Sequence, residues 1–176
     1  VIATATDQYG NSSQSSFEVV VNDNESPQIF GTPANISLTN DSGQCGAIAS
    51  WAAPSAADNC GSVSIQVSHD SGDQFPVGQT TVLILATDLY GNATTSSFSV
   101  LVEDTENPQV IGTPSSMTLS NDPGQCGAVA TWAAPSSTDN CSGHSISLSH
   151  QSGDSFPVGT TQVQVTAKDA VGNASS

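Results

Sequence analysis

Apolar and polar residues alternate along the chain in short runs, so that side chains two positions apart share the same character. Three runs show the pattern most clearly: Val63, Ile65 and Val67 between Ser62, Ser64 and Gln66; Phe98, Val100 and Val102 between Ser97, Ser99 and Leu101; and Val163, Val165 and Ala167 between Gln162, Gln164 and Thr166. Successive side chains of a β-strand point to opposite faces of its sheet, so each run predicts a half-buried strand.

Turn-forming residues separate these runs at short intervals. They include Asp41-Ser-Gly, Pro54, Asp58-Asn, Ser71-Gly-Asp, Pro76-Val-Gly and Tyr90-Gly-Asn. No stretch of a dozen residues sustains the period near 3.6 that indicates a helix. Six or seven short strands in roughly 80 residues predict an all-β chain of antiparallel β-sandwiches.

The pattern returns after 81 residues without a gap. The recurring positions are Cys45, Trp51, Pro54, Asp58, Cys60, His69, Phe75, Gly78, Asp88, Gly91 and Asn92, matched by Cys126, Trp132, Pro135, Asp139, Cys141, His150, Phe156, Gly159, Asp169, Gly172 and Asn173. Residues 1–22 match residues 82–103 in the same way. A fixed period of this length indicates tandem domains.

Two acidic stretches that contain proline mark the joints between these domains, at 23–27 and 104–108. An isolated pair of strands is at best marginally stable in water, so the strand at 15–21 is expected to pair outside the neighbouring complete domain. The chain is thus expected to be a window on a longer array. We divide it into the C-terminal strands of one repeat at 1–22, a complete repeat at 23–103, and a repeat lacking its last strand at 104–176.

Aromatic residues are few but regularly placed. Trp51 and Trp132 each end an alternating run, and we expect them to anchor the cores of their sandwiches, with sugar stacking as the alternative. Phe75 and Phe156, each before Pro-Val-Gly, are expected in the same cores.

One pair of cysteines falls in each repeat: Cys45 and Cys60, then Cys126 and Cys141. A disulfide within a pair would close a loop of about 15 residues and contribute roughly 3 kcal/mol in the chain-entropy model. Zinc is the alternative, but this spacing lacks the close pairs typical of zinc sites. We therefore expect disulfides and an oxidising, extracellular compartment.

Sites for N-linked glycans are frequent in the chain. The pattern of Asn, any residue but Pro, and Ser or Thr occurs at Asn11, Asn24, Asn35, Asn40, Asn92, Asn140 and Asn173. Asn92 and Asn173 have an alternative role as turn residues. The pattern fits a secreted glycoprotein.

Several motifs recur in fixed order: Gly-Gln-Cys-Gly-Ala, Trp before Ala-Ala-Pro, Asp-Asn-Cys, Ser-Gly-Asp-x-Phe-Pro-Val-Gly, and Asp-x-x-Gly-Asn. In this combination, which spans the full repeat, the chain resembles the HYR (hyalin repeat) family. The resemblance implies immunoglobulin-like extracellular modules, found in tandem in adhesion and matrix proteins and without catalytic residues. It also implies that Cys45 pairs with Cys60, and Cys126 with Cys141.

The charge balance excludes several partners. Lys168 is the one basic residue against 16 acidic residues, which gives a formal net charge of -15. Binding to nucleic acid or to anionic membranes depends on clustered Lys and Arg, so neither is expected. The longest apolar run, 82–86, is far shorter than the about 20 residues of a membrane-spanning helix. No Ser lies in a Gly-x-Ser-x-Gly elbow and the acidic pairs lie in joints, so we expect no enzyme and no catalytic residues.

Each joint carries an Asp and a Glu two positions apart, Asp23 with Glu25 and Asp104 with Glu106. Calcium takes six to eight oxygen ligands, which such joints supply, with the Asp-x-x-Gly-Asn turn as a further contributor. The resemblance adds that hyalin assembles in a calcium-dependent way. The alternative is that these residues are solvated turn residues whose charge keeps the chain soluble. Calcium is the only cofactor expected.

Two functions follow as hypotheses. The first is an extracellular structural or adhesive protein, in which equal repeats form a rod or filament with neighbouring copies or further repeats as partners. The alternative is a carbohydrate- or receptor-binding module within a larger secreted or surface protein. The close similarity of the two repeats favours the structural role, because a grafted binding site would concentrate changes in one copy.

Overall fold

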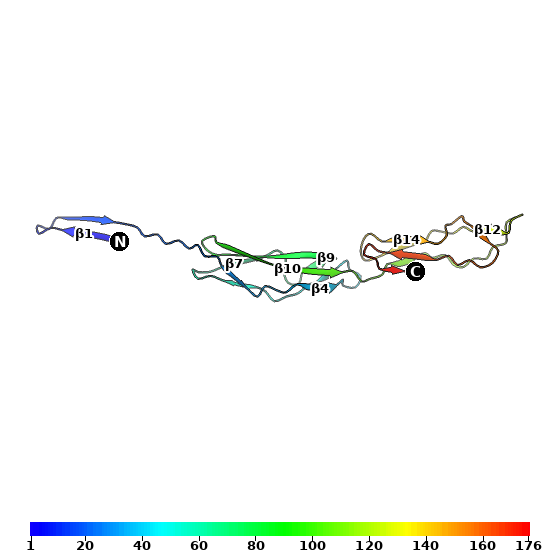
Figure 1. The fold of residues 1–176 in the computed structure, drawn as a ribbon, viewed down its shortest axis with the longest axis horizontal. Coiled ribbons are helices and arrows are strands. Elements are labelled where there is room, and N and C mark those ends of the chain that lie inside the picture. The colour runs from blue at the N-terminus through cyan, green and yellow to red at the C-terminus, as the bar shows by residue number, and fades with distance from the viewer.

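The structure is a computed structural model that describes all 176 residues, and it contains strands and turns but no helix. This confirms the all-β prediction. A hairpin and two β-sandwich units follow one another along an extended chain (Figure 1). No helix that could cross a membrane is found.

The first repeat has eight strands, most of them short. They are β3 (Gln28–Phe30), β4 (Ile36–Thr39), β5 (Gly46–Ile48), β6 (Ser55–Ala57), β7 (Ser64–Val67), β8 (Gln74–Pro76), β9 (Gly78–Thr87) and β10 (Ala93–Glu103). One layer is a four-stranded sheet in the order β4-β10-β9-β7, in which β4 runs parallel to β10 and the other pairs are antiparallel. The pairs β3–β6 and β5–β8 contribute the remaining strands.

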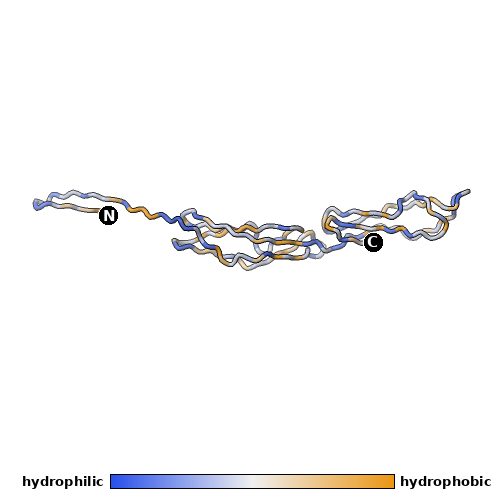
Figure 2. The backbone as a smooth tube through the Cα atoms, in the orientation of Figure 1, coloured by the Kyte–Doolittle hydropathy of each residue, from blue (hydrophilic) through white to orange (hydrophobic).

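The core of this repeat lies between the two layers, and apolar residues follow its strands in Figure 2. The long strands β9 and β10 bury one face, as the alternation predicts, and β5 and β8 cover it. The buried residues are Ala47, Ala49, Phe75, Val82, Ile84, Phe98, Val100 and Val102. Trp51 packs edge-on against Phe98, with ring centroids 5.0 Å apart, which agrees with its expected place at the core.

The second repeat has the equivalents of all strand pairs of the first repeat except β4–β10. Its strands are β11 (Gln109–Ile111), β12 (Gly127–Val129), β13 (Ser136–Thr138), β14 (Ser145–Leu148), β15 (Ser155–Pro157), β16 (Val165–Lys168) and β17 (Ala174–Ser175). Strand β17, which pairs with β16, corresponds to only the first two residues of β10, and residues 117–120, which correspond to β4, form no strand. As a result Met117 and Leu119 are about half exposed, at 46% and 51%.

The N-terminal hairpin consists of β1 (Ile2–Thr6) and β2 (Ser12–Ser16). Ile2 pairs with Ser16 and Thr6 with Ser12, which is the register of β9 and β10 shifted by one repeat. The hairpin stands apart from the first repeat in Figure 1 and is not an added strand of its sheets.

Candidate functional site at the joint between the repeats

A loop of the first repeat, residues 40–45, lies against the start of the second repeat and forms one side of the joint. Asn40 is 8% exposed, and its backbone N–H donates to the carbonyl of Glu103 at 2.9 Å. Its side-chain oxygen accepts hydrogen bonds from the N–H of Thr105, at 3.0 Å, and from the Thr105 hydroxyl. Its amide group donates to the carbonyls of Asp41 and Gln44, which closes the loop.

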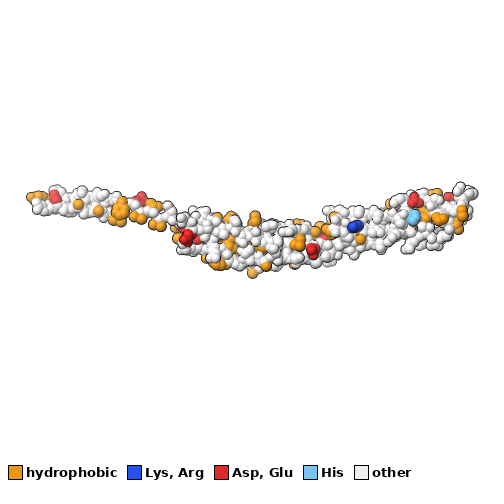
Figure 3. Space-filling model, in the orientation of Figure 1, with side chains coloured by type: hydrophobic (Ala, Val, Ile, Leu, Met, Phe, Trp, Pro, Cys, Tyr) orange, Lys and Arg blue, Asp and Glu red, His pale blue; other side chains and the backbone are white.

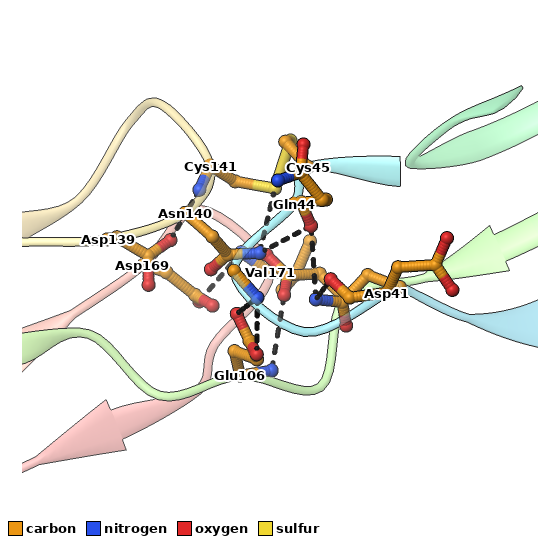
Figure 4. The surroundings of a disulfide bond; sticks show 12 residues. Asp41, Gln44, Cys45, Glu106, Asp139, Asn140, Cys141, Asp169 and Val171 are labelled. Atoms are coloured by element: carbon orange, nitrogen blue, oxygen red, sulfur yellow. Dashed lines mark hydrogen bonds between the residues drawn. A yellow bond between two sulfur atoms is a disulfide. The ribbon is translucent and has the colours of Figure 1, made fainter. Parts of the chain in front are cut away.

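Two polar side chains of the second repeat form hydrogen bonds with the backbone of the same loop (Figure 4). The Glu106 carboxylate accepts the Gly43 N–H at 2.9 Å and 3.1 Å from its two oxygens. The Asn140 amide donates to the Gln44 carbonyl at 3.0 Å. Hydrogen bonds to a charged acceptor are stronger than neutral ones, so Glu106 fixes the loop in place.

A disulfide joins the repeats within this contact, from Cys45 to Cys141, which are 96 residues apart in sequence (Figure 4). Their Cα atoms are 4.8 Å apart, inside the range that a disulfide requires. Cys60 and Cys126 are exposed free thiols. The predicted pairs Cys45–Cys60 and Cys126–Cys141 are therefore wrong.

The physical reason is the place of each cysteine in its sandwich. Cys45 lies on the loop at 40–45, which faces the following repeat, whereas Cys60 lies beside Asp23 and Glu25 at the first joint. Cys141 holds the position of Cys60 one repeat later, and so it faces Cys45. Because the period is constant, a spacing of 15 residues within a repeat implies one of 96 residues between repeats, and sequence spacing alone does not distinguish them.

Three carboxylates of the second repeat converge beside the disulfide. One oxygen each of Asp104, Asp139 and Asp169 lie within 4.8 Å of one another. Asp104 begins the joint, Asp139 follows β13 and Asp169 follows β16. Asp104 and Asp169 are 9% and 7% exposed.

Asp169 is held in its charged form by its own turn. Its Oδ1 accepts the backbone N–H groups of Val171, Gly172 and Asn173. Partial desolvation, the largest single influence, raises the pKa of Asp169, but these N–H groups and the Asn173 amide together lower it below its usual value. The Asn173 amide also donates to the Asp104 carbonyl at 3.1 Å, which ties the turn to the joint.

Two oxygens near this cluster are buried and lack a hydrogen-bond donor: Oδ1 of Asp139 and Oδ1 of Asn140. Buried oxygens without a partner are costly, and three carboxylates at this separation repel one another. Lys168, the one basic residue of the chain, is exposed. A divalent cation that prefers oxygen ligands would bind the unpaired oxygens and would neutralise the repulsion among the three carboxylates. The residues present therefore fit calcium.

Of the four predicted calcium ligands, the two Asp residues lie in clusters of acidic or thiol groups, whereas the two Glu residues form hydrogen bonds elsewhere. Asp104 belongs to the cluster, but Glu106 is turned toward Gly43. At the first joint Asp23 lies with Asp58 and Cys60, and its buried Oδ2 has no donor. Glu25 there accepts a hydrogen bond from Asn59 at 2.6 Å.

Asp139 was not among the predicted ligands, and the turn that contains Asp169 was predicted only as a further contributor. The signal for Asp139 is its place in the repeated Asp-Asn-Cys motif, two residues before the cysteine that forms the disulfide at the joint. The Asp139 Oδ2 accepts the N–H of Cys141 at 3.1 Å, so the motif aligns the carboxylate and the thiol together.

The predicted glycan acceptors have unequal surroundings. Asn24 and Asn35 are exposed, and no hydrogen bond occupies their amide nitrogens. The amide nitrogens of the other five donate hydrogen bonds to other groups: Asn11, Asn40, Asn92, Asn140 and Asn173.

The fold and the joint together define a tandem-repeat protein of immunoglobulin-like β-sandwiches joined end to end. The HYR domain matches residues 22–102 and again residues 103–176, and the chain belongs to the HYR family. It is 37% identical over 180 residues to hyalin of Lytechinus variegatus, an alignment that covers 98% of this chain and 34% of that protein.

Other relatives show the same family in different contexts. The chain is 34% identical over 181 residues to hyalin of Strongylocentrotus purpuratus, covering 98% of this chain and 15% of that protein. It is 33% identical over 162 residues to the sushi, von Willebrand factor type A, EGF and pentraxin domain-containing protein 1 of Rattus norvegicus. That alignment covers 88% of this chain and 4% of that protein. The chain thus spans about a third or less of the relatives that it matches, and it consists of HYR repeat modules.

Proposed function

We propose that the chain is part of an extracellular structural or adhesive array, in which sandwiches joined by stiff contacts form a rod or filament. The observation that carries this proposal is the joint itself. Two features limit rotation between the repeats: the disulfide, and a loop whose hydrogen bonds involve the side chains of Asn40, Glu106 and Asn140. Because the residues of the joint recur every 81 positions, equal joints would build a regular assembly.

Complementary surfaces at the two ends support assembly into longer arrays. The second repeat has an open groove lined by apolar residues that include Met117, Trp132 and Phe156, at the place that β10 fills in the first repeat. Residues 17–21 after the hairpin expose Phe17, among others, on the face that is buried in β10. A neighbouring copy or a further repeat is therefore the proposed partner.

Calcium is proposed to stiffen each joint, held in the second repeat by Asp104, Asp139 and Asp169. The support is the convergence of their carboxylates and the orphaned oxygens of Asp139 and Asn140. Neutralised carboxylates would no longer repel one another, so the ion would hold the start of the repeat, the Asp-Asn-Cys segment and the turn at Asp169 as one unit.

The proposed location is outside the cell, with sugars attached. A disulfide that joins two domains persists in an oxidising compartment. Asn24 and Asn35 are the proposed glycan positions, because their exposed amide nitrogens are not engaged in hydrogen bonds. Acidic side chains are scattered along the visible face in Figure 3, which favours a well-solvated surface.

Cryo-electron microscopy of the native protein tests the proposed function. We expect unbranched filaments in which sandwiches of one size follow one another at a constant rise and rotation. Particles with no constant relation between successive domains would contradict the proposal.

A further inference from the structure

Two exposed thiols remain once the joint between the repeats is formed, Cys60 and Cys126. They are the repeat equivalents of Cys141 and Cys45, which form the disulfide. We propose that both are disulfide sites: Cys126 bonds the Asp-Asn-Cys cysteine of another copy of the repeat, and Cys60 bonds the Gly-Gln-Cys cysteine of another copy. The inference rests on the proposed tandem array and adds that each repeat is covalently linked to both neighbours.

The loop that carries Cys126 already has the conformation of the docked loop that carries Cys45. The Asn121 amide donates to the Gln125 carbonyl at 2.9 Å, as Asn40 does to Gln44 at 3.2 Å. The Asp122 carboxylate accepts the Val129 N–H at 3.1 Å, and its equivalent Asp41 accepts the N–H of Ile48 at 3.0 Å. The loop at 121–126 therefore needs no rearrangement to dock on a following repeat.

The surface around Cys60 is the matching half of a joint. Glu25 and Asn59 are the equivalents of Glu106 and Asn140, which grip the preceding loop in the occupied joint. With no loop to bind, Glu25 and Asn59 bond each other at 2.6 Å. The Asp58 carboxylate accepts the Cys60 N–H at 2.8 Å, as Asp139 does for Cys141, so the thiol has the orientation set by the same motif.

The environment of Cys60 suits a structural cysteine and not a redox catalyst. The carboxylates of Asp23 and Asp58 lie beside the Cys60 thiol, and Lys168, the one basic residue of the chain, belongs to the other repeat. Catalytic and redox-sensing cysteines instead have lowered pKa values and positively charged surroundings.

Formation of each bond needs an oxidant. The two thiols lose two protons and two electrons as the S–S bond forms. The electrons pass to a protein disulfide oxidant of the secretory route, whose own S–S bond breaks and is reduced to a dithiol through thiol–disulfide exchange. No other group is consumed.

Mass mapping of the native, unreduced protein tests the inference. Free thiols are first blocked with N-ethylmaleimide in denaturant, and the protein is digested with pepsin, because acid suppresses disulfide exchange and Lys168 is the only trypsin site. The Cys45–Cys141 peptide pair serves as the internal control. We expect the Cys60 peptide only in pairs with a Gly-Gln-Cys peptide other than that of Cys45, and the Cys126 peptide only in pairs with an Asp-Asn-Cys peptide other than that of Cys141.

Recovery of Cys60 and Cys126 as N-ethylmaleimide adducts would overturn the inference. Disulfides that join two Gly-Gln-Cys cysteines, or two Asp-Asn-Cys cysteines, would also overturn it. Gel electrophoresis with and without reductant identifies the source of the other copy: a fall in mass on reduction indicates a neighbouring molecule, and an unchanged mass indicates the same chain. Either source supports the inference. Blocked thiols in material that still forms filaments would refute the covalent links alone, whereas linked cysteines in material without filaments would refute the proposed function alone.

Discussion

Cys45 and Cys141 show at the scale of single residues how the joint gains stability. Their disulfide closes a loop of 96 residues, and for a loop near 100 residues the chain-entropy model gives about 4.7 kcal/mol, against roughly 3 kcal/mol for a loop of about 15 residues. The bond between repeats therefore restricts the unfolded chain more than the bonds predicted within repeats would.

We predict that Cys141→Ser lowers the free energy of unfolding by about 2–5 kcal/mol, because it removes this constraint. Chemical denaturation of the oxidised monomer at low protein concentration measures the change. Ser142→Ala, at the exposed position next to Cys141, is the matched control, and it should change stability by less than about 0.5 kcal/mol. Equal losses in the two variants would show that the bond does not stabilise the chain.

Gly46 allows close approach of β5 to β8. A Cβ atom added there would collide with the carbonyl oxygen of Phe75. We predict that Gly46→Ala destabilises the first repeat by about 1–3 kcal/mol, because the backbone must shift in a packed core. Thermal unfolding followed by Trp fluorescence measures this, with the exposed Ser50→Ala as control. A variant as stable as the control would contradict the packing at Gly46.

Asp88 provides a pH-dependent prediction. Partial desolvation, the largest influence, raises its pKa, but the Asn92 side chain and the N–H groups of Tyr90 and Asn92 together lower it. A lowered pKa in the folded state means that the charged carboxylate stabilises the fold above the unfolded pKa, and that this contribution is lost as the pH falls through the folded pKa. The stability difference between the wild type and Asp88→Asn should therefore shrink on acidification in calcium-free buffer.

Carbon-detected NMR titration of the Asp88 carboxyl group, alongside denaturation at each pH, checks this sign. The Asp88 pKa should lie below the value of 3.8 of an unperturbed Asp. A Glu18→Gln variant, with its change on an exposed segment, should show a stability difference that does not follow this titration. An Asp88 pKa above 3.8 would contradict the turn described here.

At the scale of strands, alternation predicted the long elements well. The buried face of Phe98, Val100 and Val102 in β10 is the predicted one, because side chains of a strand alternate regardless of its partners. Strand formation at 117–120 depends instead on a distant partner. In the first repeat the equivalent strand, β4, is stabilised by its pairing with Val100–Glu103 of β10. The sequence of the segment itself does not indicate whether such a pairing partner is present.

The two sandwich cores permit a direct comparison of this dependence. Phe75 in β8 is fully buried, whereas its equivalent Phe156 in β15 is only partly buried beside the open groove. We predict that Phe75→Ala costs about 3–5 kcal/mol, the usual range for a buried Phe, and that Phe156→Ala costs less. Denaturant unfolding of the two variants measures both; an equal cost would contradict the more open core of the second repeat.

At the scale of the whole molecule, the repeat period predicted the joints but not their contacts. Asp104 could be named from its place in an acidic linker. Its partners Asp139 and Asp169 come from two other segments, and only the folded sandwich brings the three together. The cysteine pairing failed for the same reason, since Cys45 and Cys60 face opposite neighbours.

We predict that millimolar calcium raises the melting temperature of the chain relative to excess chelator, because an ion that binds only the folded state stabilises it. Asp139→Asn should reduce this rise by removing a ligand from the Asp104–Asp139–Asp169 cluster. Glu18→Gln removes one negative charge from an exposed segment and is the matched control, with an unchanged response. Identical melting with calcium and with chelator in the wild type would exclude calcium from the joint.

The central claim is that the two repeats form one stiff unit through the joint at Cys45 and Cys141. Residual dipolar couplings of the backbone amides test it most directly, because they report the alignment of each repeat separately. In the oxidised chain with calcium, couplings from residues 23–103 and 104–176 should fit one alignment tensor of equal magnitude. Two tensors of clearly different magnitude would show that the repeats move independently and would contradict the stiff joint.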